Sequence, residues 1–368
     1  MSKWSKVPFN EIIADETRKA IKIKQEDYLS NGKYQIIDQG QVQVSGYTNQ
    51  EVGVYSDVPA IIFGDHTRVI KYVDRPFFLG ADGVKLLKTK NDYLDYKFLY
   101  YFFLKNKIPN TGYNRHFKWL KELSIPIPPL EVQNDIAKVL DKTQEIIDGH
   151  KKQLEELDHL IKATFYDMFG DPIVNEKNLR LEKLSNVCEK ITDGTHDTPP
   201  RFKEGILLIT GKNIKPFKID LTEVEYVSKE DHDLIYKRCN PEFKDILYTN
   251  IGVNYGTAAI NPFEFEFSMK NVALLKYRRD ILTGEYLQCY LNYKRDYIIS
   301  QNKTGGAQTF MGLAKIKQLD ILIPSIELQN KFSTIVSNIE EQKSIISRSL
   351  KESQTLFNSL MSKYFDES

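Results

Sequence analysis

The sequence has few cysteines, and their spacing builds neither a cross-linked nor a metal-bound site. Cys188, Cys239 and Cys289 lie far apart in the 368 residues and form no C-x-x-C pair. Disulfide scaffolds and zinc sites need closely and regularly spaced cysteines. The sequence therefore argues against both and indicates a reducing compartment.

Long apolar runs are also absent. No stretch reaches the roughly 20 apolar residues that a membrane-spanning helix needs. The first six residues, Met-Ser-Lys-Trp-Ser-Lys, lack the apolar core of a secretory signal. We therefore expect a cytoplasmic protein with no membrane segment.

Motifs of DNA-modifying chemistry are missing as well. The nearest match to an adenine-methyltransferase motif, Asn261-Pro262-Phe263, lacks the second proline, and residues 205–212 have the wrong spacing for a phosphate loop. The six histidines show no metal-ligand spacing, and His196 and His232 are expected on the surface or in loops. We predict no catalytic, cofactor-binding or metal-binding residues, and hence a chain that is not an enzyme.

The net charge of +1 is unevenly distributed along the chain. Residues 130–171 hold 5 Lys and Arg against 10 Asp and Glu, and residues 326–368 hold 5 against 6. Residues 1–129 carry a net charge of +5, and residues 172–325 carry +2. The positive charge is therefore concentrated outside two acidic segments, which is compatible with a polyanionic partner such as DNA.

One long stretch occurs twice. The segment from Leu123 to Asp171 returns from Leu319 to Glu367 at a constant offset of 196 residues. Matched pairs include Leu123 with Leu319, Glu131 with Glu327, Gln133 with Gln329, Asn134 with Asn330, Leu154 with Leu350, Leu160 with Leu356 and Phe169 with Phe365. An ungapped register over this length indicates an internal duplication.

Each copy predicts a short edge strand followed by a long helix. Residues 123–127 alternate in polarity and meet prolines, as an edge strand does. Apolar positions then recur at spacings of four and three residues, the pattern of a coiled coil. These seam positions are Ile136, Leu140, Thr143, Ile147, His150, Leu154, Leu157, Ile161, Thr164 and Met168, and then Phe332, Val336, Ile339, Lys343, Ile346, Leu350, Ser353, Phe357, Leu360 and Tyr364. Gly170 and Pro172 mark the end of the first helix.

An apolar stripe of this kind needs a partner to be stable in water. We therefore expect the two helices, each of roughly 35 residues and about 50 Å long, to pack against each other in antiparallel fashion. The alternative is two independent helices, each packed only on its neighbouring domain. The polar seam residues Thr143, His150, Lys343 and Ser353 would fix the register of the pair.

The segments outside the helices predict two globular domains that share one plan. Short β-like runs cover residues 34–37, 41–44, 60–63, 69–73 and 84–87, and residues 96–106 predict an aromatic-rich helix. Further on, 245–250 matches 59–64, 271–276 matches 82–88, and 286–297 replaces the aromatic helix. We predict an α+β fold, with two mixed α/β domains joined by two long α-helices that pack as an antiparallel coiled coil with pseudo-twofold symmetry. The predicted segments are 1–128, 129–171, 172–324 and 325–368.

This arrangement resembles the specificity subunit of type I restriction–modification enzymes. The resemblance is carried by the phrase from Ile125 to Gln133, Ile-Pro-Ile-Pro-Pro-Leu-Glu-Val-Gln, and by its echo at residues 321–329. Residues 245–252 and the loop Thr192-Asp-Gly-Thr-His196 are also similar. The chain departs from the pattern in two ways: Ser325 replaces the second proline of the echo, and the first domain has no Gly-Thr-His.

The resemblance implies that each globular domain is a target recognition domain reading one half of a bipartite, asymmetric DNA site. It implies that the helices act as spacers and dock two methyltransferase subunits, with restriction and translocase subunits joining outside. S-adenosylmethionine, ATP and Mg would be held only by those partners. Two heads on a rigid helix pair can address major-groove sites about one helical turn, roughly 34 Å, apart.

Base readout needs Arg or Lys for guanine and Asn or Gln for adenine, carried on loops beside phosphate contacts. The loops richest in these residue types supply our candidate DNA contacts. In the first domain they are Asn114, Arg115, His116 and Lys118; in the second, His196, Arg201, Lys203, Lys212, Asn213, Asn254, Gln301, Asn302, Lys303, Thr304 and Gln308. Gly112 and Gly305-Gly306 would allow close backbone approach, while Tyr255 and Phe310 are expected in the core.

Two other functions stay open. A helical scaffold whose two heads bind proteins would share the architecture, but its binding to duplex DNA would be absent or insensitive to salt. A fused nuclease or methyltransferase is disfavoured by the missing motifs. Methyl transfer to DNA by the purified chain alone would support it.

Overall fold

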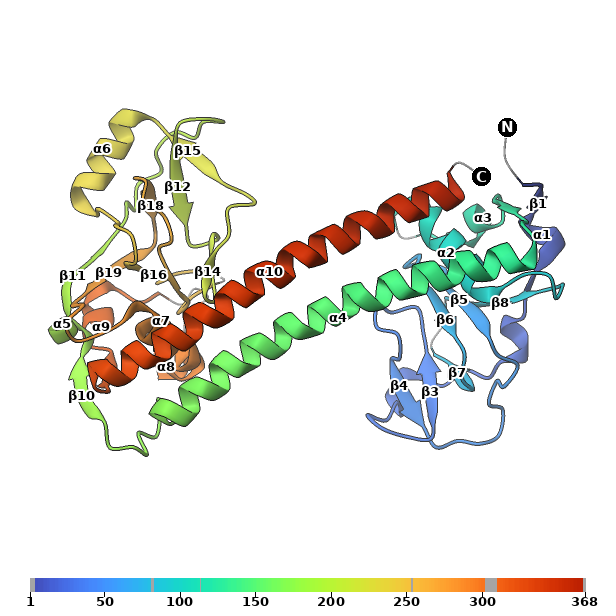
Figure 1. Cartoon of the computed structure of the whole chain (residues 1–368), viewed down its shortest axis with the longest axis horizontal. Coiled ribbons are helices and arrows are strands. Elements are labelled where there is room, and N and C mark those ends of the chain that lie inside the picture. The colour runs from blue at the N-terminus through green and yellow to red at the C-terminus, as the bar shows by residue number, and fades with distance from the viewer. Residues whose placement is uncertain (1–3, 81–82, 113, 253, 302–309, 367–368) are drawn as a thin grey trace. The chain divides into compact units, whose positions relative to one another are not determined.

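The computed structural model describes residues 4–80, 83–112, 114–252, 254–301 and 310–366. Contacts group the chain into two compact units: residues 1–152 with 347–368, and residues 153–346. Each unit contains a globular part, called a head below, and half of each long helix (Figure 1). The long helices are α4, Leu130–Phe169, and α10, Ile326–Phe365.

The first head is built from two small sheets and short helices. Its sheets have the strand orders β2-β8-β5-β6 and β4-β3-β7, and β1 pairs with β9 at an edge. The strands are β1 Lys6–Pro8, β2 Ile13–Asp15, β3 Tyr34–Ile37, β4 Gly46–Thr48, β5 Ala60–Gly64, β6 Ile70–Val73, β7 Phe77–Leu79, β8 Val84–Thr89 and β9 Ser124–Pro126. The helices are α1 Phe9–Ile12, α2 Tyr96–Lys105 and α3 Phe117–Leu120, with 3-10 turns at Thr17–Lys19 and Gln25–Asp27.

The second head repeats this plan and adds to it. Its sheets are β11-β19-β16-β17 and β15-β12-β18, with β10 paired to β20 and a hairpin of β13 and β14. The strands are β10 Arg180–Lys183, β11 Cys188–Asp193, β12 Ile206–Thr210, β13 Ile214–Lys215, β14 Lys218–Ile219, β15 Glu225–Val227, β16 Ile246–Tyr248, β17 Ala258–Ile260, β18 Ser268–Lys270, β19 Ala273–Tyr277 and β20 Asp320–Ile323. The helices are α5 Leu184–Val187, α6 Lys229–Arg238, α7 Gly284–Tyr293, α8 Arg295–Gln301 and α9 Leu313–Lys317.

The shared plan confirms the predicted matches between the two heads. β16 takes the place of β5, β19 that of β8 and α7 that of α2, each with the same neighbours in its sheet or beside it. The hairpin β13–β14, α6 and α8 have no counterpart among the described elements of the first head. The two heads therefore share one scaffold but carry different surfaces.

One predicted strand is wrong. Residues 41–44 form bends and irregular backbone, and the strand begins at Gly46 instead. Polar contacts hold this segment: Lys71 Nζ donates to the Val42 carbonyl at 2.6 Å, and Gln43 Nε2 donates to the Tyr72 carbonyl at 2.7 Å. The Val42 carbonyl thus binds a lysine side chain and the Gln43 side chain binds β6, in place of the backbone pairing of a strand.

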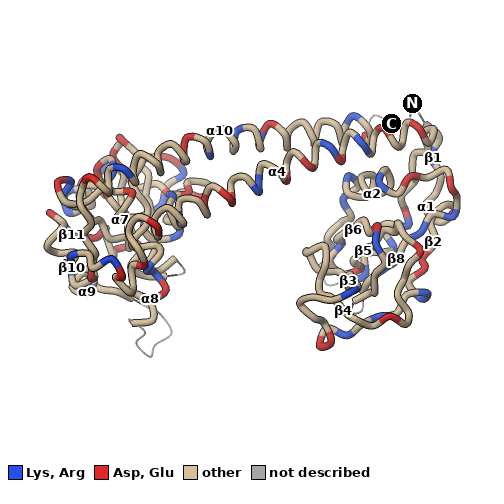
Figure 2. The backbone as a smooth tube through the Cα atoms, turned by 60° about the horizontal axis from the view of Figure 1, so that its bottom comes forward, with Lys and Arg blue, Asp and Glu red and all other residues tan. Residues whose placement is uncertain are grey.

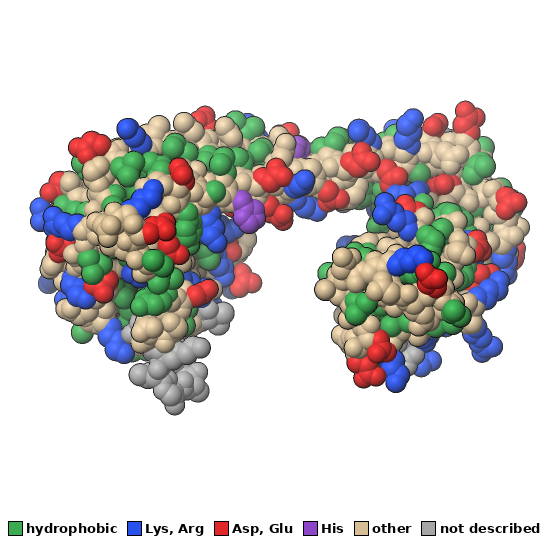
Figure 3. All heavy atoms as spheres, turned by 90° about the horizontal axis from the view of Figure 1, so that it is seen from below, with side chains coloured by type: hydrophobic (Ala, Val, Ile, Leu, Met, Phe, Trp, Pro, Cys, Tyr) green, Lys and Arg blue, Asp and Glu red, His purple; other side chains and the backbone are tan. Residues whose placement is uncertain are grey.

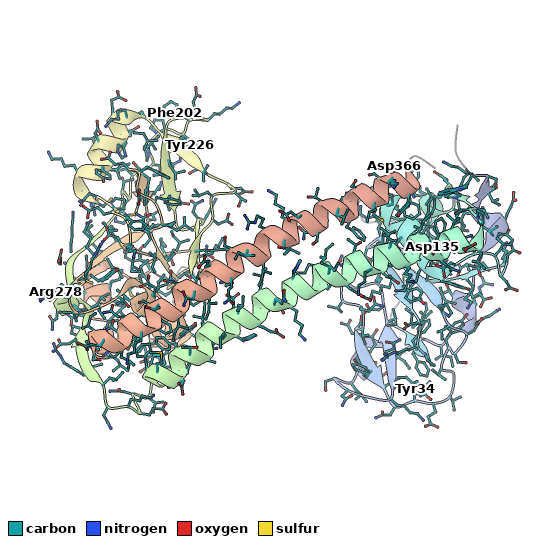
Figure 4. The ribbon with its side chains drawn as sticks, in the orientation of Figure 1. Tyr34, Asp135, Phe202, Tyr226, Arg278 and Asp366 are labelled. Carbon is teal, nitrogen blue, oxygen red and sulfur yellow. The ribbon has the colours of Figure 1, made fainter. Side chains whose placement is uncertain are left out.

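In the first unit the helices pack on each other and on the head. The start of α4 contributes Ile136 and Leu140, and the end of α10 contributes Met361 and Phe365, to one buried cluster with the aromatic helix α2. Lys105 of α2 pairs with Asp366 (labelled in Figure 4) at 2.6 Å. The two helices run in opposite directions here, as predicted.

In the second unit the end of α4 meets the start of α10. Phe165 and Phe169 lie with their ring centroids 5.8 and 5.2 Å from that of Phe332. Further along, Lys343 Nζ lies 2.7 Å from Asp158 Oδ1 of the facing helix. Antiparallel pairing is thus confirmed within each unit, whereas the pseudo-twofold axis, which would relate the units, stays a prediction.

The seam positions of both helices are all buried or half-buried. Each helix has 40 residues, five more than expected. α4 ends at Phe169, where Gly170 turns with φ of +78° and donates its N–H to the Tyr166 carbonyl. The first long helix therefore ends at the predicted glycine.

A buried glutamine joins each helix to its head. Gln133 and Gln329 are both fully buried. Gln133 accepts from the Asp95 N–H at 2.9 Å and donates to the carbonyls of Tyr93 and Pro128. Gln329 makes the same three bonds with Thr283, Ile281 and Pro324, so the repeated Leu-Glu-x-Gln or Ile-Glu-x-Gln element is a structural clamp.

Within the described ranges, none of the helices combines the length and apolar character that crossing a bilayer requires.

Candidate nucleic-acid interface

In the first head, loops that follow three strands come together at one edge. β3 and β7 are parallel, so their carboxyl ends lie side by side. The Gly80 N–H donates to the Ile37 carbonyl at 2.8 Å, and the Asp65 N–H donates to the Gly83 carbonyl at 2.6 Å. Thr67 Oγ1 donates to the Gln39 carbonyl at 2.6 Å. These bonds join the loops after β3, β5 and β7 into one polar edge.

A further loop, residues 109–112 and 114–116, packs on this edge. His116 is fully buried; its N–H donates to the Asp65 carbonyl at 2.8 Å, and its Nδ1 lies 3.0 Å from the same oxygen. The buried Asp65 carboxylate accepts from the Phe117 N–H at 2.8 Å, where α3 begins. His66 Nδ1 lies 3.2 Å from the Asn114 carbonyl. The loop is thus held in place by backbone and ring contacts.

The four candidate residues of the first head differ in their exposure. Asn114, Arg115 and Lys118 are exposed. His116 is committed to holding the loop, so a contact with DNA would first require its bonds to break. Asn114 Nδ2 also bonds the Thr111 carbonyl, and Lys118 Nζ lies 4.9 Å from the centroid of the Trp119 ring. Arg115 is therefore the least constrained of the four.

Two lysines that we did not single out from the sequence lie beside these residues. Lys85 Nζ lies 5.0 Å and Lys121 Nζ 4.7 Å from the centroid of the Phe117 ring. Lys85 also pairs with Asp15 at 2.9 Å. Burial disfavours the charged Asp15 carboxylate, yet hydrogen bonds from Thr17 and Lys85 outweigh it and hold the pKa below its ordinary value. β8 and α3 are distant in the sequence, so their proximity could not be predicted from local pattern.

The second head repeats the edge with other side chains. β12 and β18 are parallel, and the loops after β12, β16 and β18 line a hollow of about 1240 Å³. Asn254 Nδ2 donates to the Gly211 carbonyl at 3.0 Å, and the Asn271 N–H donates to the Thr195 carbonyl at 3.2 Å. The loops after β12, β16, β18 and β11 are therefore held together, as in the first head.

Some candidate residues of this head serve the loop structure. Asn213 is buried; its Oδ1 accepts from Thr210, and its Nδ2 donates to the carbonyls of Asp220 and Glu223. Asn254 is half-buried and bonded as above. Arg201 Nε pairs with Glu225 at 3.0 Å, while its buried guanidinium nitrogen Nη1 has no acceptor among the residues that the structure describes.

The remaining candidates divide into exposed residues and residues outside the described ranges. Lys203, Lys212 and Gln301 are exposed. Phe202, exposed beside Lys203, bonds through its backbone to Tyr226; both are labelled in Figure 4. Asn302, Lys303, Thr304 and Gln308, with Gly305 and Gly306, lie outside the residues that the structure describes.

His196 is at the centre of a polar network at this edge. Its Nε2 lies 2.8 Å from Asp193 Oδ2, and its Nδ1 lies 3.0 Å from Asn271 Oδ1. Asp193 is buried and also pairs with Arg238 of α6. The ring is exposed, as expected, but its orientation is fixed by two partners.

Three further residues, Tyr255, Phe310 and His232, differ in burial. Tyr255 is buried in the core, as predicted. Phe310 is 48% exposed, so its assignment to the core is wrong. His232 is 1% exposed and bonds Ser268 and Glu266, so its placement on the surface or in a loop is wrong. Its position on α6 turns it toward β18, which the sequence pattern does not reveal.

Opposite charges are interleaved over the chain. Lys and Arg alternate with Asp and Glu along both heads and both long helices (Figure 2).

Burial lowers the pKa of Lys71, and Asp38, 3.7 Å away at the first loop edge, opposes that shift. Over the described ranges, no three His, Cys, Asp or Glu side chains are placed to hold a metal ion.

Comparison with known families gives a direct match. Residues 1–159 match the family model described as type I restriction modification DNA specificity domain. The chain is similar to the type I restriction enzyme EcoR124I/EcoR124II specificity subunit of Escherichia coli, with 30% identity over 91% of this chain and 88% of the relative. It is also similar to the putative type I restriction enzyme MjaX specificity subunit of Methanocaldococcus jannaschii, with 23% identity over 74% and 68% of the two chains.

A solved structure shares the fold. The crystal structure of a type I restriction-modification system S subunit from M. genitalium covers 98% of this chain and 96% of its own, with a TM-score of 0.67 and 19% identity. The relatives are named specificity subunits, in agreement with the predicted non-catalytic role. On the strength of the 30% identity over nearly the full length of both chains, this protein belongs to the family of type I restriction–modification specificity subunits.

Proposed function

We propose that each head reads one half of a bipartite, asymmetric DNA site. The observation that carries the proposal is the loop edge that both heads build on the same strand order. The side chains on the two edges differ, so the two half-sites should differ as well. A symmetric dimer, by contrast, presents identical readers and favours palindromes.

The proposed contacts come from the exposed and half-buried residues of these edges. In the first head they are Asn114, Arg115 and Lys118, joined by Lys85 and Lys121. In the second they are His196, Arg201, Lys203, Lys212 and Gln301, with Asn302, Lys303, Thr304 and Gln308 kept as sequence-based candidates. We assign His116, Asn213 and Asn254 to holding the loops, because their polar atoms bond the protein itself.

We further propose that segments 1–128 and 172–324 are target recognition domains, and that segments 129–171 and 325–368 are spacers that set the distance between half-sites. Support comes from the way each helix is fastened. Gln133 and Gln329 clamp the helix starts, and each helix end enters the core of the other head's unit. Both ends of each helix are therefore fastened to a globular head, as a spacer would require.

We also propose that two methyltransferase subunits dock on exposed faces of the long helices. Val139 and Leu160 of α4 are 40% and 49% exposed, and their partners at an offset of 196, Ile335 and Leu356 of α10, are 38% and 54% exposed. Each member of a pair falls in a different unit. Apolar side chains are exposed among charged ones along the helices in Figure 3. Exposed apolar positions that recur in both copies suggest two equivalent protein-binding surfaces.

Catalysis would then belong to the partners. Methyltransferase subunits would hold S-adenosylmethionine and extrude the target adenine, and restriction and translocase subunits, with ATP and Mg, would join outside. The cytoplasm is the proposed site of action. This chain would supply sequence choice and spacing.

Binding of the purified chain, with its methyltransferase subunits, to duplex DNA tests the proposal. We expect log Kd to change steeply with log salt, with a slope of roughly 5 for about six phosphate contacts. Methylation sequencing of a host carrying all subunits should show a split, asymmetric site. Binding that is absent or independent of salt would favour the scaffold with protein-binding heads.

A further inference from the structure

A hollow of about 570 Å³ lies on the first unit, where α2 and β6 face α4. Its walls have distinct chemistry. One is aromatic, with Tyr72, Tyr100 and Tyr101; the other is mainly acidic, with Asp141, Glu145 and Asp148 beside a single cation, Lys152. A second hollow of about 620 Å³ shares Asp141 and Glu145 and extends along α4 to the exposed Val139.

The aromatic wall already holds one cation. The ring centroids of Tyr72 and Tyr100 lie 6.3 Å apart, and those of Tyr100 and Tyr101 lie 5.2 Å apart. Lys97 Nζ lies 4.4 Å from the centroid of Tyr72. Ring faces attract cations through their quadrupole, so this wall favours a positively charged group.

The acidic wall is only partly neutralised. Asp141 is satisfied, with Lys97 at 3.1 Å and the Tyr101 hydroxyl at 2.6 Å. Glu145 pairs with Lys142 at 3.4 Å and Asp148 pairs with Lys151 at 3.0 Å, both on the exposed face of α4. Gln144 Nε2 also donates to Asp148 at 3.1 Å. Such surface pairs contribute little and exchange readily. Two carboxylates are therefore available to an incoming cation.

A glycine leaves the rim open. Gly149 lines the hollow, and a Cβ atom built on it would meet nothing within 4 Å. A side chain from another molecule can therefore reach the tyrosines past this point.

The second unit does not repeat this chemistry. At an offset of 196, Ser337 and Ser344 replace Asp141 and Asp148, and Ile345 replaces Gly149. The Gln133 and Gln329 clamps align Asp95 with Thr283. By that register Gln288 and Cys289 of α7 take the positions of Tyr100 and Tyr101. The helix faces are duplicated, but at these compared positions the tyrosines and acidic residues of the first unit are replaced in the second.

We propose that the hollow anchors an arginine side chain of the methyltransferase subunit that docks on the first unit, so that the two docking surfaces differ in affinity and fill in order. The inference rests on the proposed docking of two such subunits. Arginine fits because its planar guanidinium both stacks on tyrosine rings and pairs with two carboxylates. The acidic wall repels DNA phosphates, and the hollow runs on to Val139 of the proposed docking face.

Stepwise binding of the methyltransferase subunit to the full chain tests this inference. We expect two unequal affinities by native mass spectrometry and calorimetry at about 50 mM salt, converging at about 300 mM as surface charges are screened. The tighter step should weaken about fivefold in Glu145→Lys. The matched variant Glu341→Lys, at the same position of the other copy, should leave it within about twofold.

A second variant blocks the hollow without changing charge. Gly149→Leu should weaken the tighter step at about 50 mM salt while leaving DNA binding by the chain unchanged. Circular dichroism checks that each variant is folded. Two equal steps in the unaltered chain, or equal losses in Glu145→Lys and Glu341→Lys, would overturn the inference and leave the proposed function standing. Failure of the unaltered chain to bind any methyltransferase subunit would refute the docking proposal itself.

Discussion

Gln133 accepts a hydrogen bond from the backbone N–H of Asp95 at 2.9 Å, and this contact fixes the start of α4 to the start of α2. Asp95 in turn caps α2, since its carboxylate accepts from the Phe98 N–H at 2.7 Å. Gln329 and Thr283 repeat the contact at 2.9 Å in the second unit. The duplicated Leu-Glu-x-Gln or Ile-Glu-x-Gln element therefore attaches each long helix to its head.

Gln133→Ala tests this joint. The substitution removes the partner of the Asp95 N–H and of the Tyr93 and Pro128 carbonyls, so we expect the free energy of unfolding of the first unit to fall by about 2–4 kcal/mol. Urea denaturation followed by circular dichroism measures it. Gln329→Ala should cost the second unit a similar amount, whereas the exposed Gln153→Ala should change stability by less than about 0.5 kcal/mol.

Replacing Gly149 should stabilise the protein instead of destabilising it. A glycine inside an exposed helix costs about 0.5–1 kcal/mol relative to alanine, and nothing obstructs a Cβ there. Gly149→Ala should therefore raise the melting temperature. At Gly170, where φ is +78° and a Cβ atom would lie 3.0 Å from the side chain of Glu176, the same change should lower it. A rise in both variants would contradict the argument from backbone conformation.

The spacer role is tested by length. Inserting four residues after Gln153 adds about 6 Å of helix and turns the following segment relative to the preceding one. We expect methylation sequencing to report a changed half-site spacing or no activity. The matching insertion after Val52, which is 80% exposed in a loop of the first head, should keep the spacing. An unchanged target after the helix insertion would mean that the helices do not set the distance.

Arg115 tests the first loop edge. If its guanidinium meets a phosphate, Arg115→Ala should weaken DNA binding for all sequences and lower the salt slope by about 1. A loss confined to one base position would instead indicate direct readout. Arg75, which is exposed after β6 and away from the loop edge, provides the control, and equal losses from Arg75→Ala would argue against this edge as the interface.

Lys343 gives a pH dependence. Burial disfavours its charged form, but hydrogen bonds to Asp158 and Glu340 outweigh this and raise its pKa above the ordinary 10.5. A lysine whose pKa is higher in the folded state than in the unfolded state stabilises the protein at any pH below the unfolded-state pKa. This stabilisation is lost as the pH rises through the folded-state pKa. We expect the stability difference between the unaltered chain and Lys343→Met to be constant from neutral pH to about 10 and to shrink above it, as followed by urea denaturation.

Sequence alone determined the parts of this protein that depend on regular repetition. The 196-residue offset predicted two helices, the seam predicted which faces are buried, and Gly170 predicted where the first helix ends. Alternating runs located β3, β5, β6 and β8. A helix or strand with one buried face needs apolar residues at a regular spacing, so its presence can be predicted from residues that are close together in the sequence.

Tertiary structure decided the rest. It gathered loops from distant strands into one edge in each head, turned His116 and Asn213 inward as supports, exposed Phe310, and placed Lys85 beside α3. It also set three tyrosines against the acidic face of α4 in the first unit. These outcomes depend on contacts between residues far apart in the chain, where a polar side chain is buried or exposed according to the partner it meets and not according to its neighbours in sequence.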